Sequence, residues 1–139
     1  MIRAVLDTYV YVAALLSRHG APARLVAALH EGLFDALTCP KQLAELAGVL
    51  ARPKIARHVS ADTARDFVAW LERVAVTVPD PCDVAALSPD PDDDYLIALA
   101  HSGRARVIVS GDAHLLQIED ATPPVIPPAE FALLVEGLP

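Results

Sequence analysis

The chain has 139 residues, of which 54% are hydrophobic, and its formal net charge is −7. This length fits a single domain covering residues 1–139, and the apolar fraction excludes a disordered chain. The longest unbroken apolar run, Tyr9 to Leu16, is too short to span a membrane, and Asp7 interrupts the only candidate signal segment. We therefore expect a soluble, cytoplasmic protein without membrane contact.

The first third of the chain predicts two strands separated by helices. Arg3 to Asp7 is an apolar run that ends in a carboxylate and predicts a buried strand, and Phe34 to Thr38 predicts a second. Between them we expect a helix from Tyr9 to Leu16, with Thr8 as its N-cap, and another from Ala21 to His30.

Two longer helices are predicted next. In the helix from Lys41 to Leu50, one apolar stripe is expected to face the core, and Glu45 lies beside it. That stripe contains Leu43, Leu46, Ala47 and Leu50. A short basic segment follows, with Arg52, Lys54, Arg57 and His58. The second helix, Ala61 to Val74, leads into a weak strand from Val74 to Val78.

The last third predicts a loop from Pro79 to Asp92 and a helix from Tyr95 to His101. Arg106 to Ser110 then predicts a strong strand, which is followed by Gly111, Asp112 and a short helix near Leu115. The closing elements are a minimal strand, Val125-Ile126, and a helix, Ala129 to Val135. This alternation of strands and helices predicts an α/β domain with a mainly parallel sheet.

Acidic residues mark the ends of these predicted strands. Asp7 ends the first strand, Asp112 follows the last strong strand, and a cluster at residues 90–94 precedes the helix before that strand. Because ligands bind at the carboxyl ends of parallel strands, we expect these acids to converge there. Glu45, near the start of the helix after the second strand, can join them.

Gathered carboxylates repel each other, and a divalent cation removes that penalty. Ligands that are all oxygen suit Mg²⁺ or Mn²⁺, and no histidine or cysteine is placed to favour zinc. Such ions can activate water and stabilise the leaving oxygen in phosphodiester hydrolysis. The alternative is that each acid only caps a helix or forms a turn. Four acids in one short run exceed what a cap needs, and the joint placement of this run with Asp7, Glu45 and Asp112 favours a metal-dependent nuclease.

Other classes of site find little support. Cys39 and Cys82 form no C-x-x-C pair, and no Walker or dinucleotide-binding glycine motif is present. A phosphoaspartate enzyme is a further alternative because a strand ends in Asp7-Thr8. The second aspartate that dehalogenase-like enzymes need is replaced by Tyr9.

Five segments together resemble the PIN-domain family, in the branch of toxin components related to VapC. They are Val5-Leu6-Asp7-Thr8, Leu43-Ala44-Glu45-Leu46, Leu50 to Ile55, Asp90 to Ala100, and Val109-Ser110-Gly111-Asp112. The resemblance implies a three-layer α/β/α sandwich with a parallel five-stranded sheet. It also implies a Mg²⁺- or Mn²⁺-dependent ribonuclease that hydrolyses RNA, forms homodimers and is inhibited by a cognate antitoxin protein.

The resemblance places three catalytic, metal-binding acids of the family on Asp7, Glu45 and Asp112. The remaining acid falls on Asp93 in the pattern of this branch and on Asp94 in the VapC-type spacing. We prefer Asp93 as the catalytic residue and keep Asp94 as a further metal ligand.

Four residues are expected to support the site or contact RNA. Ser110 would support a carboxylate or a bound water, and Arg52 and Lys54 would contact phosphates. Tyr9 stands where the family usually has asparagine. Its ring either stacks on a base or blocks the site. The alternative function is therefore a weakened or inactive PIN-like module that binds RNA or a partner protein.

Overall fold

A computed structural model describes residues 1–81, 91–118 and 122–137. For residues 91–94 it describes the backbone and not the side chains. A five-stranded parallel sheet has the order β3-β2-β1-β4-β5. Its strands are β1 (Arg3–Leu6), β2 (Asp35–Thr38), β3 (Val76–Thr77), β4 (Val107–Val109) and β5 (Val125–Ile126). This topology confirms the predicted α/β fold with its parallel sheet of five strands.

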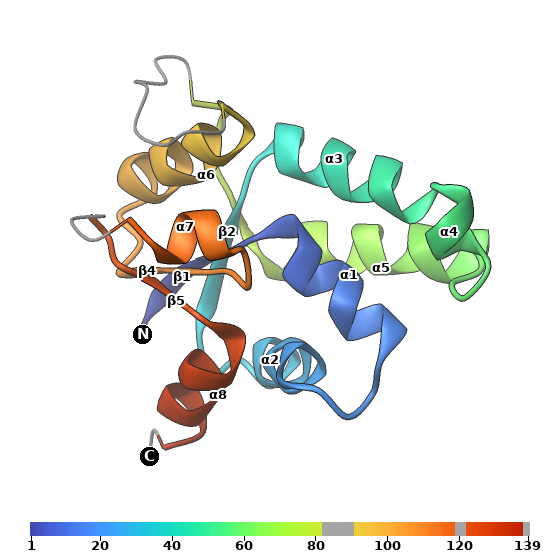
Figure 1. Cartoon of the computed structure of the whole chain (residues 1–139), viewed down its shortest axis with the longest axis horizontal. Helices are drawn as coiled ribbons and strands as arrows, with labels where there is room; N and C mark the ends of the chain where they lie inside the picture. Colours follow the sequence, from blue (N-terminus) through green and yellow to red (C-terminus); the bar gives the residue numbers. More distant parts are fainter. Residues whose placement is uncertain (82–90, 119–121, 138–139) are drawn as a thin grey trace.

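Helices connect the strands and lie on both sides of the sheet (Figure 1). They are α1 (Thr8–Leu16), α2 (Ala21–His30), α3 (Pro40–Leu50), α4 (Pro53–Ala56), α5 (Ala61–Val74), α6 (Pro91–Ser102), α7 (Ala113–Leu116) and α8 (Pro128–Glu136). Within the described ranges, no helix is both long enough and apolar enough to cross a membrane.

The central strand β1 contributes to two separate cores. Ala4 and Leu6 belong to the larger core, which α1, α2, α3, α5 and α8 complete. Val5 belongs to the smaller core, which lies under α6 and α7. Successive side chains of a strand point to opposite faces of the sheet. The unbroken apolar run of β1 is therefore what a strand buried on both faces requires.

The sheet register brings the carboxyl ends of β1 and β4 side by side. Leu6 pairs with Val109, and the backbone N–H of Asp7 donates to the carbonyl oxygen of Val109 at 2.9 Å. After α6, the chain turns sharply at Gly103, where a Cβ atom would lie only 2.4 Å from Cδ1 of Leu37. Because Gly103 has no side chain, α6 can lie close to β2 and lead directly into β4.

Two predicted helix starts are wrong. Helix α1 is capped by Asp7 and not by Thr8, because the Asp7 carboxylate accepts from the backbone N–H of Tyr9. Helix α6 begins at Pro91, inside the predicted loop, because proline suits the first turn of a helix. Residues 82–90 of that loop, which include Cys82, lie outside the described residues.

The stripe predicted to face the core is wrong at Ala47, which is exposed. The buried residues of α3 are Gln42, Leu46, Val49 and Leu50. The buried face of α3 is therefore rotated about the helix axis relative to the predicted face, and it includes the polar side chain of Gln42. The basic segment that follows also contains a short helix, α4, which the sequence pattern did not predict.

Candidate active site

A cavity of about 370 Å³ opens at the carboxyl edge of the sheet. Asp7, which follows β1, and Asp112, which follows β4, both line it, so two of the predicted acids share one cavity. Its remaining lining residues are Tyr9, Val10, Ala13, Pro22, Gly111 and Pro128. The site therefore lies where the parallel sheet places the ends of two neighbouring strands.

Asp7 is held in one orientation by two hydrogen bonds. Its Oδ1 atom accepts from the backbone N–H of Tyr9 at 3.2 Å, and its Oδ2 atom accepts from the hydroxyl of Ser110 at 2.8 Å. Only 8% of Asp7 is exposed. The Asp7 carboxylate is buried, caps a helix and accepts a hydrogen bond from a serine hydroxyl. It therefore has little freedom to rotate.

Ser110 connects the two acids of the cavity. While its hydroxyl donates to Asp7, the same oxygen accepts from the backbone N–H of Asp112 at 3.0 Å. The Asp112 carboxylate is fixed in turn, because its Oδ1 atom accepts from the backbone N–H of His114 at 2.8 Å and caps α7. The fully buried Ser110 thus sets the relative positions of Asp7 and Asp112.

Glu45 and Asp112 are both within electrostatic reach of Asp7, although Glu45 does not line the cavity. Burial raises the pKa of Asp7, and the charges of Glu45 and Asp112 raise it further. The hydrogen bonds from Ser110 and from the Tyr9 backbone offset part of that rise. The cavity therefore disfavours the charged form of Asp7, chiefly because the carboxyl group is buried.

Glu45 reaches this region from α3 and is half-buried. Its Oε1 atom accepts a hydrogen bond from the hydroxyl of Tyr95 on α6 at 3.1 Å. Burial raises the pKa of Tyr95, and the charge of Glu45 raises it further. The hydroxyl consequently stays protonated and remains a donor to the carboxylate.

Asp93 and Asp94 lie in the first turn of α6, which begins at Pro91. Their side chains lie outside the described residues, so the choice between them as the remaining acid stays a prediction. Tyr95, which follows them in the sequence, contacts Glu45.

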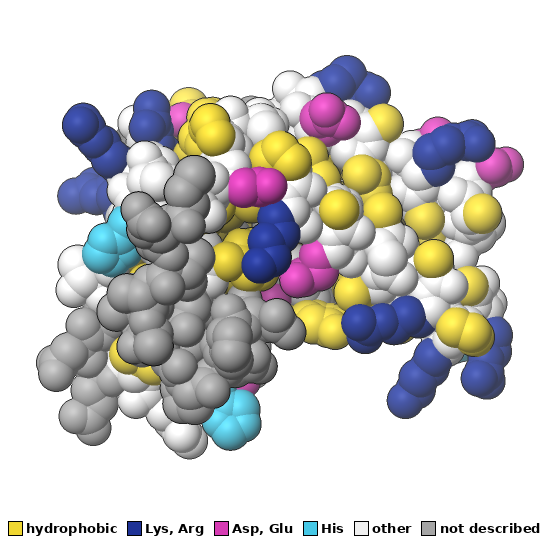
Figure 2. All heavy atoms as spheres, turned by 90° about the horizontal axis from the view of Figure 1, so that it is seen from above, with side chains coloured by type: hydrophobic (Ala, Val, Ile, Leu, Met, Phe, Trp, Pro, Cys, Tyr) yellow, Lys and Arg dark blue, Asp and Glu magenta, His cyan; other side chains and the backbone are white. Residues whose placement is uncertain are grey.

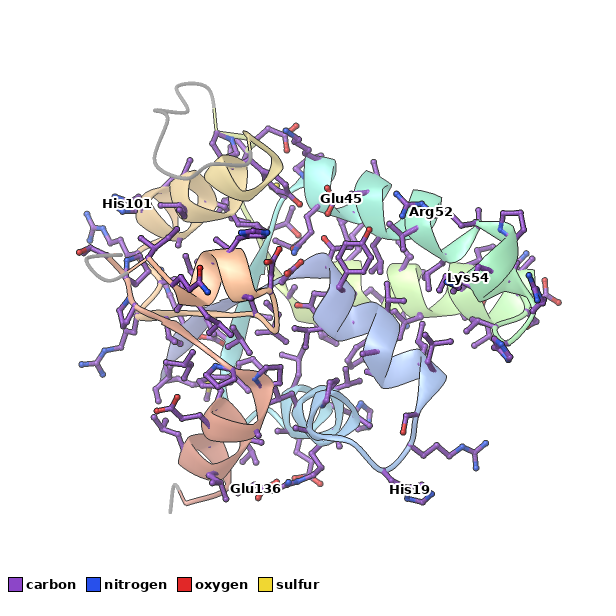
Figure 3. The ribbon with its side chains drawn as sticks, viewed as in Figure 1. His19, Glu45, Arg52, Lys54, His101 and Glu136 are labelled. Atoms are coloured by element: carbon purple, nitrogen blue, oxygen red, sulfur yellow. The ribbon has the colours of Figure 1, made fainter. Side chains whose placement is uncertain are left out.

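The predicted RNA-contacting residues are not all brought together. A guanidinium nitrogen of Arg52 donates to the hydroxyl of Tyr9 at 3.0 Å, which places Arg52 beside the cavity. Tyr9 is 53% exposed and lines that cavity. Lys54 lies on α4, and Figure 3 shows Glu45, Arg52 and Lys54 in that order along α3 and α4. Figure 2 shows basic side chains at this end of the molecule, but others lie at the opposite end and between acidic side chains near the middle of this face.

Sequence reasoning missed two polar residues behind the acids. Tyr95 was interpreted only as the start of a helix, although its position directly after an acidic run could have marked it. Gln42 is fully buried, and its amide nitrogen donates to the carbonyl oxygen of Leu6 at 2.6 Å, while Thr38 donates to its Oε1 atom at 2.7 Å. A buried glutamine in an otherwise apolar stripe indicates such a role, because buried polar groups require partners.

The donor chemistry of the acids fits a hard divalent cation. Asp7, Glu45 and Asp112 offer only oxygen ligands, and a cation would favour the charged form of Asp7 against the burial and the neighbouring charges that raise its pKa. Among the described residues, no three acidic, histidine or cysteine side chains already form a complete metal-binding group. The side chains of Asp93 and Asp94, which would complete the set, are outside that comparison.

Two known proteins are similar to this chain, one in sequence and one in fold. The uncharacterized protein MJ1680 of Methanocaldococcus jannaschii is 25% identical over 120 residues, which cover 86% of this chain and 76% of that protein. The fold is similar to the crystal structure of PAE2754 from Pyrobaculum aerophilum, with a TM-score of 0.65 and 14% identity. That match covers 99% of this chain and 91% of the other.

A second solved structure has a similar fold: VapBC2 from Rickettsia felis, bound to a DNA fragment from their promoter. The TM-score is 0.58 at 10% identity, over 91% of this chain and 98% of that one. The family model of the PIN domain matches residues 3–114, which contain Asp7, Glu45 and Asp112. This chain belongs to the PIN domain family.

Proposed function

We propose that this protein is a metal-dependent endoribonuclease and the toxin component of a type II toxin–antitoxin system. The observation that supports this most directly is geometric: Asp7 and Asp112, from two distant parts of the chain, line one cavity and are joined by hydrogen bonds through Ser110. PIN domains are in general nucleases that use divalent metal ions, and this chain matches their family model over most of its length.

Each residue of the site has a separate task in this proposal. Asp7, Glu45 and Asp112, together with Asp93 or Asp94, would hold Mg²⁺ or Mn²⁺. When bound, the metal supplies activation of a water molecule and stabilisation of charge on the leaving oxygen of the RNA. Ser110 would hold the Asp7 carboxylate and the backbone of Asp112 through its two hydrogen bonds.

Two basic residues would bind the substrate. Arg52 stands beside the cavity and would hold a phosphate of the RNA backbone, because a guanidinium can form two parallel hydrogen bonds to phosphate oxygens. Lys54 on α4 would contact a phosphate farther along the strand.

The proposal includes two protein partners. The similar structure from Rickettsia felis is named as VapBC2 bound to a fragment of promoter DNA, which supports a cognate antitoxin for this chain. We further propose that the chain forms a homodimer, as the resemblance to the VapC-related branch implies.

Cleavage assays test the nuclease proposal directly. We expect the purified protein to cut single-stranded or structured RNA in the presence of Mg²⁺ or Mn²⁺, and EDTA to stop the reaction. A DNA strand of the same sequence tests the preference for RNA. Cleavage that persists in EDTA, or no cleavage in any metal, would contradict the assignment.

Tyr9 separates an active enzyme from a binding module. Its exposed ring lines the cavity, so we expect it to pack against a base of bound RNA. Stacking of this kind contributes about 1–3 kcal/mol. Tyr9→Ala should therefore raise KM by about tenfold and leave kcat nearly unchanged, as measured by steady-state kinetics.

Tyr9→Phe is the matched control, because it keeps the ring and removes only the acceptor of the Arg52 hydrogen bond. Its KM should stay close to that of the unaltered chain. If Tyr9→Ala instead increases kcat, the ring obstructs the site, and the weakened PIN-like module becomes the better description.

A further inference from the structure

Tyr95 forms a contact between α6 and α3 inside the candidate site. The side chain is 2% exposed, and its hydroxyl donates to Oε1 of Glu45 at 3.1 Å. The two residues are 50 positions apart in the sequence, and each lies on a different helix. Their contact therefore fixes the position of the acid from α3 relative to α6.

Helix α3 holds the same tyrosine at a second point. The ammonium nitrogen of Lys41 lies 4.5 Å from the centroid of the Tyr95 ring, in a cation–π contact. Lys41 and Glu45 are four residues apart, so both lie on one side of α3. The backbone N–H of Lys41 also donates to Asp80 at 2.8 Å, which anchors the first turn of this helix.

These contacts restrict Glu45 in a way that its own helix cannot. A half-buried glutamate has three rotatable side-chain bonds, and a carboxylate that must bind a cation loses affinity when it samples several orientations. A hydroxyl donor on one carboxylate oxygen selects a single orientation. Hydrogen bonds of this kind to ligating carboxylates tune the affinity of metal sites.

We propose that Tyr95 is a positioning residue, whose hydroxyl holds one oxygen of Glu45 so that the other oxygen is presented to the divalent cation. Lys41 helps to keep the ring in place through its cation–π contact with the ring face. This inference rests on the proposed function, because it concerns the same metal-binding acids.

Calorimetric titration of the purified chain with Mn²⁺ tests the inference without any measurement of activity. Tyr95→Phe removes only the hydroxyl, and we expect the affinity for Mn²⁺ to fall by about tenfold. The melting temperature of Tyr95→Phe in EDTA should change by no more than that of Tyr11→Phe, a control variant that also loses one buried tyrosine hydroxyl. In RNA cleavage at saturating substrate, kcat at a fixed low Mn²⁺ concentration should fall while KM for RNA stays the same.

Tyr11→Phe is the matched control. Tyr11 is also fully buried, and its hydroxyl has no hydrogen-bond partner among the described residues. Its removal should leave the affinity for Mn²⁺ unchanged. If both variants weaken Mn²⁺ binding to the same degree, the effect belongs to loss of a buried hydroxyl in general, and the role of Tyr95 is refuted.

A double-mutant cycle gives a second measurement that depends on the contact itself. In a Glu45→Ala background, Tyr95→Phe should cause no further loss of Mn²⁺ affinity, because the carboxylate that it positions is gone. Additive losses would overturn the inference, and so would Mn²⁺ binding by Tyr95→Phe that equals that of the unaltered chain.

The titration also distinguishes failure of this inference from failure of the proposed function. Unaltered Mn²⁺ binding in Tyr95→Phe rejects only the positioning role. Mn²⁺ binding that depends on Tyr95 in a chain that cleaves no RNA supports the positioning role and rejects the nuclease. If the unaltered chain binds no Mn²⁺, both are overturned.

Discussion

Replacing Asp7 by asparagine is expected to lower RNA cleavage by on the order of a hundredfold or more, while the fold stays at least as stable as before. Asparagine keeps the size of the side chain and can still accept from the backbone N–H of Tyr9. It removes the negative charge that would bind the cation. Cleavage rates with saturating Mg²⁺ or Mn²⁺ measure this loss.

The stability of this variant follows from the environment of Asp7. Burial raises the pKa of this carboxyl above its ordinary value of 3.8, so the folded chain favours the protonated form. The contribution of Asp7 to stability is therefore complete below pH 3.8 and declines as the pH rises through the raised pKa. Asparagine has no charge to lose or gain, so this decline disappears in the variant.

Thermal unfolding in EDTA checks the sign of this effect. Above the raised pKa of Asp7, we expect Asp7→Asn to melt at the same temperature as the unaltered chain or at a higher one. Around pH 3 the advantage should vanish. A variant that melts well below the unaltered chain at neutral pH would show that the carboxylate stabilises the fold, which would argue against a charge held there for catalysis.

Asp35→Asn is the control for position. Asp35 is a partly buried aspartate on a strand of the same sheet. It is the first residue of β2 and therefore lies at the edge of the sheet opposite to the cavity. Its register partner is Arg3, the first residue of β1. Cleavage activity should be unaffected by this substitution. Equal losses in Asp7→Asn and Asp35→Asn would point to general damage and not to a metal site.

The sheet could be predicted from the sequence because its central strands are continuous apolar runs, a pattern that is visible within each strand alone. The apolar runs that end at Leu6 and Val109 are buried on both faces, and such strands read as continuous hydrophobic segments. Parallel pairing then requires their carboxyl ends to meet. That requirement places Asp7 and Asp112 in one cavity before any side-chain geometry is known.

The side-chain geometry of the site does not follow from such patterns. Tyr95 and Glu45 meet because α6 packs near α3, and no periodicity within either helix encodes that contact. The choice of Asp7 over Thr8 as N-cap depends on backbone angles at the end of β1, since both residue types can cap a helix. Gln42 breaks the apolar stripe of α3 in order to satisfy the carbonyl group of Leu6.

Ser110→Ala should lower RNA cleavage by about 10- to 100-fold, which is less than the loss caused by Asp7→Asn. The serine touches two acids at once, donating to Asp7 and accepting from the backbone of Asp112. Its loss frees the Asp7 carboxylate to rotate. It also removes a hydrogen bond that lowers the pKa of Asp7, so the charged form becomes less favourable still.

Ser102→Ala is the matched control for the serine variant, because within the part of the chain that the structure describes the Ser102 hydroxyl donates to the Leu99 carbonyl at the end of α6 and contacts none of the candidate acids. Each variant loses one hydroxyl, and the net cost of a lost hydrogen bond is about 1 kcal/mol. Stability alone therefore cannot separate them, whereas cleavage rates can. Full activity in Ser110→Ala would mean that Asp7 and Asp112 hold their positions without this serine. The backbone hydrogen bond from Asp7 to Val109 would then be enough to keep the two acids in place, and Ser110 would have no positioning role.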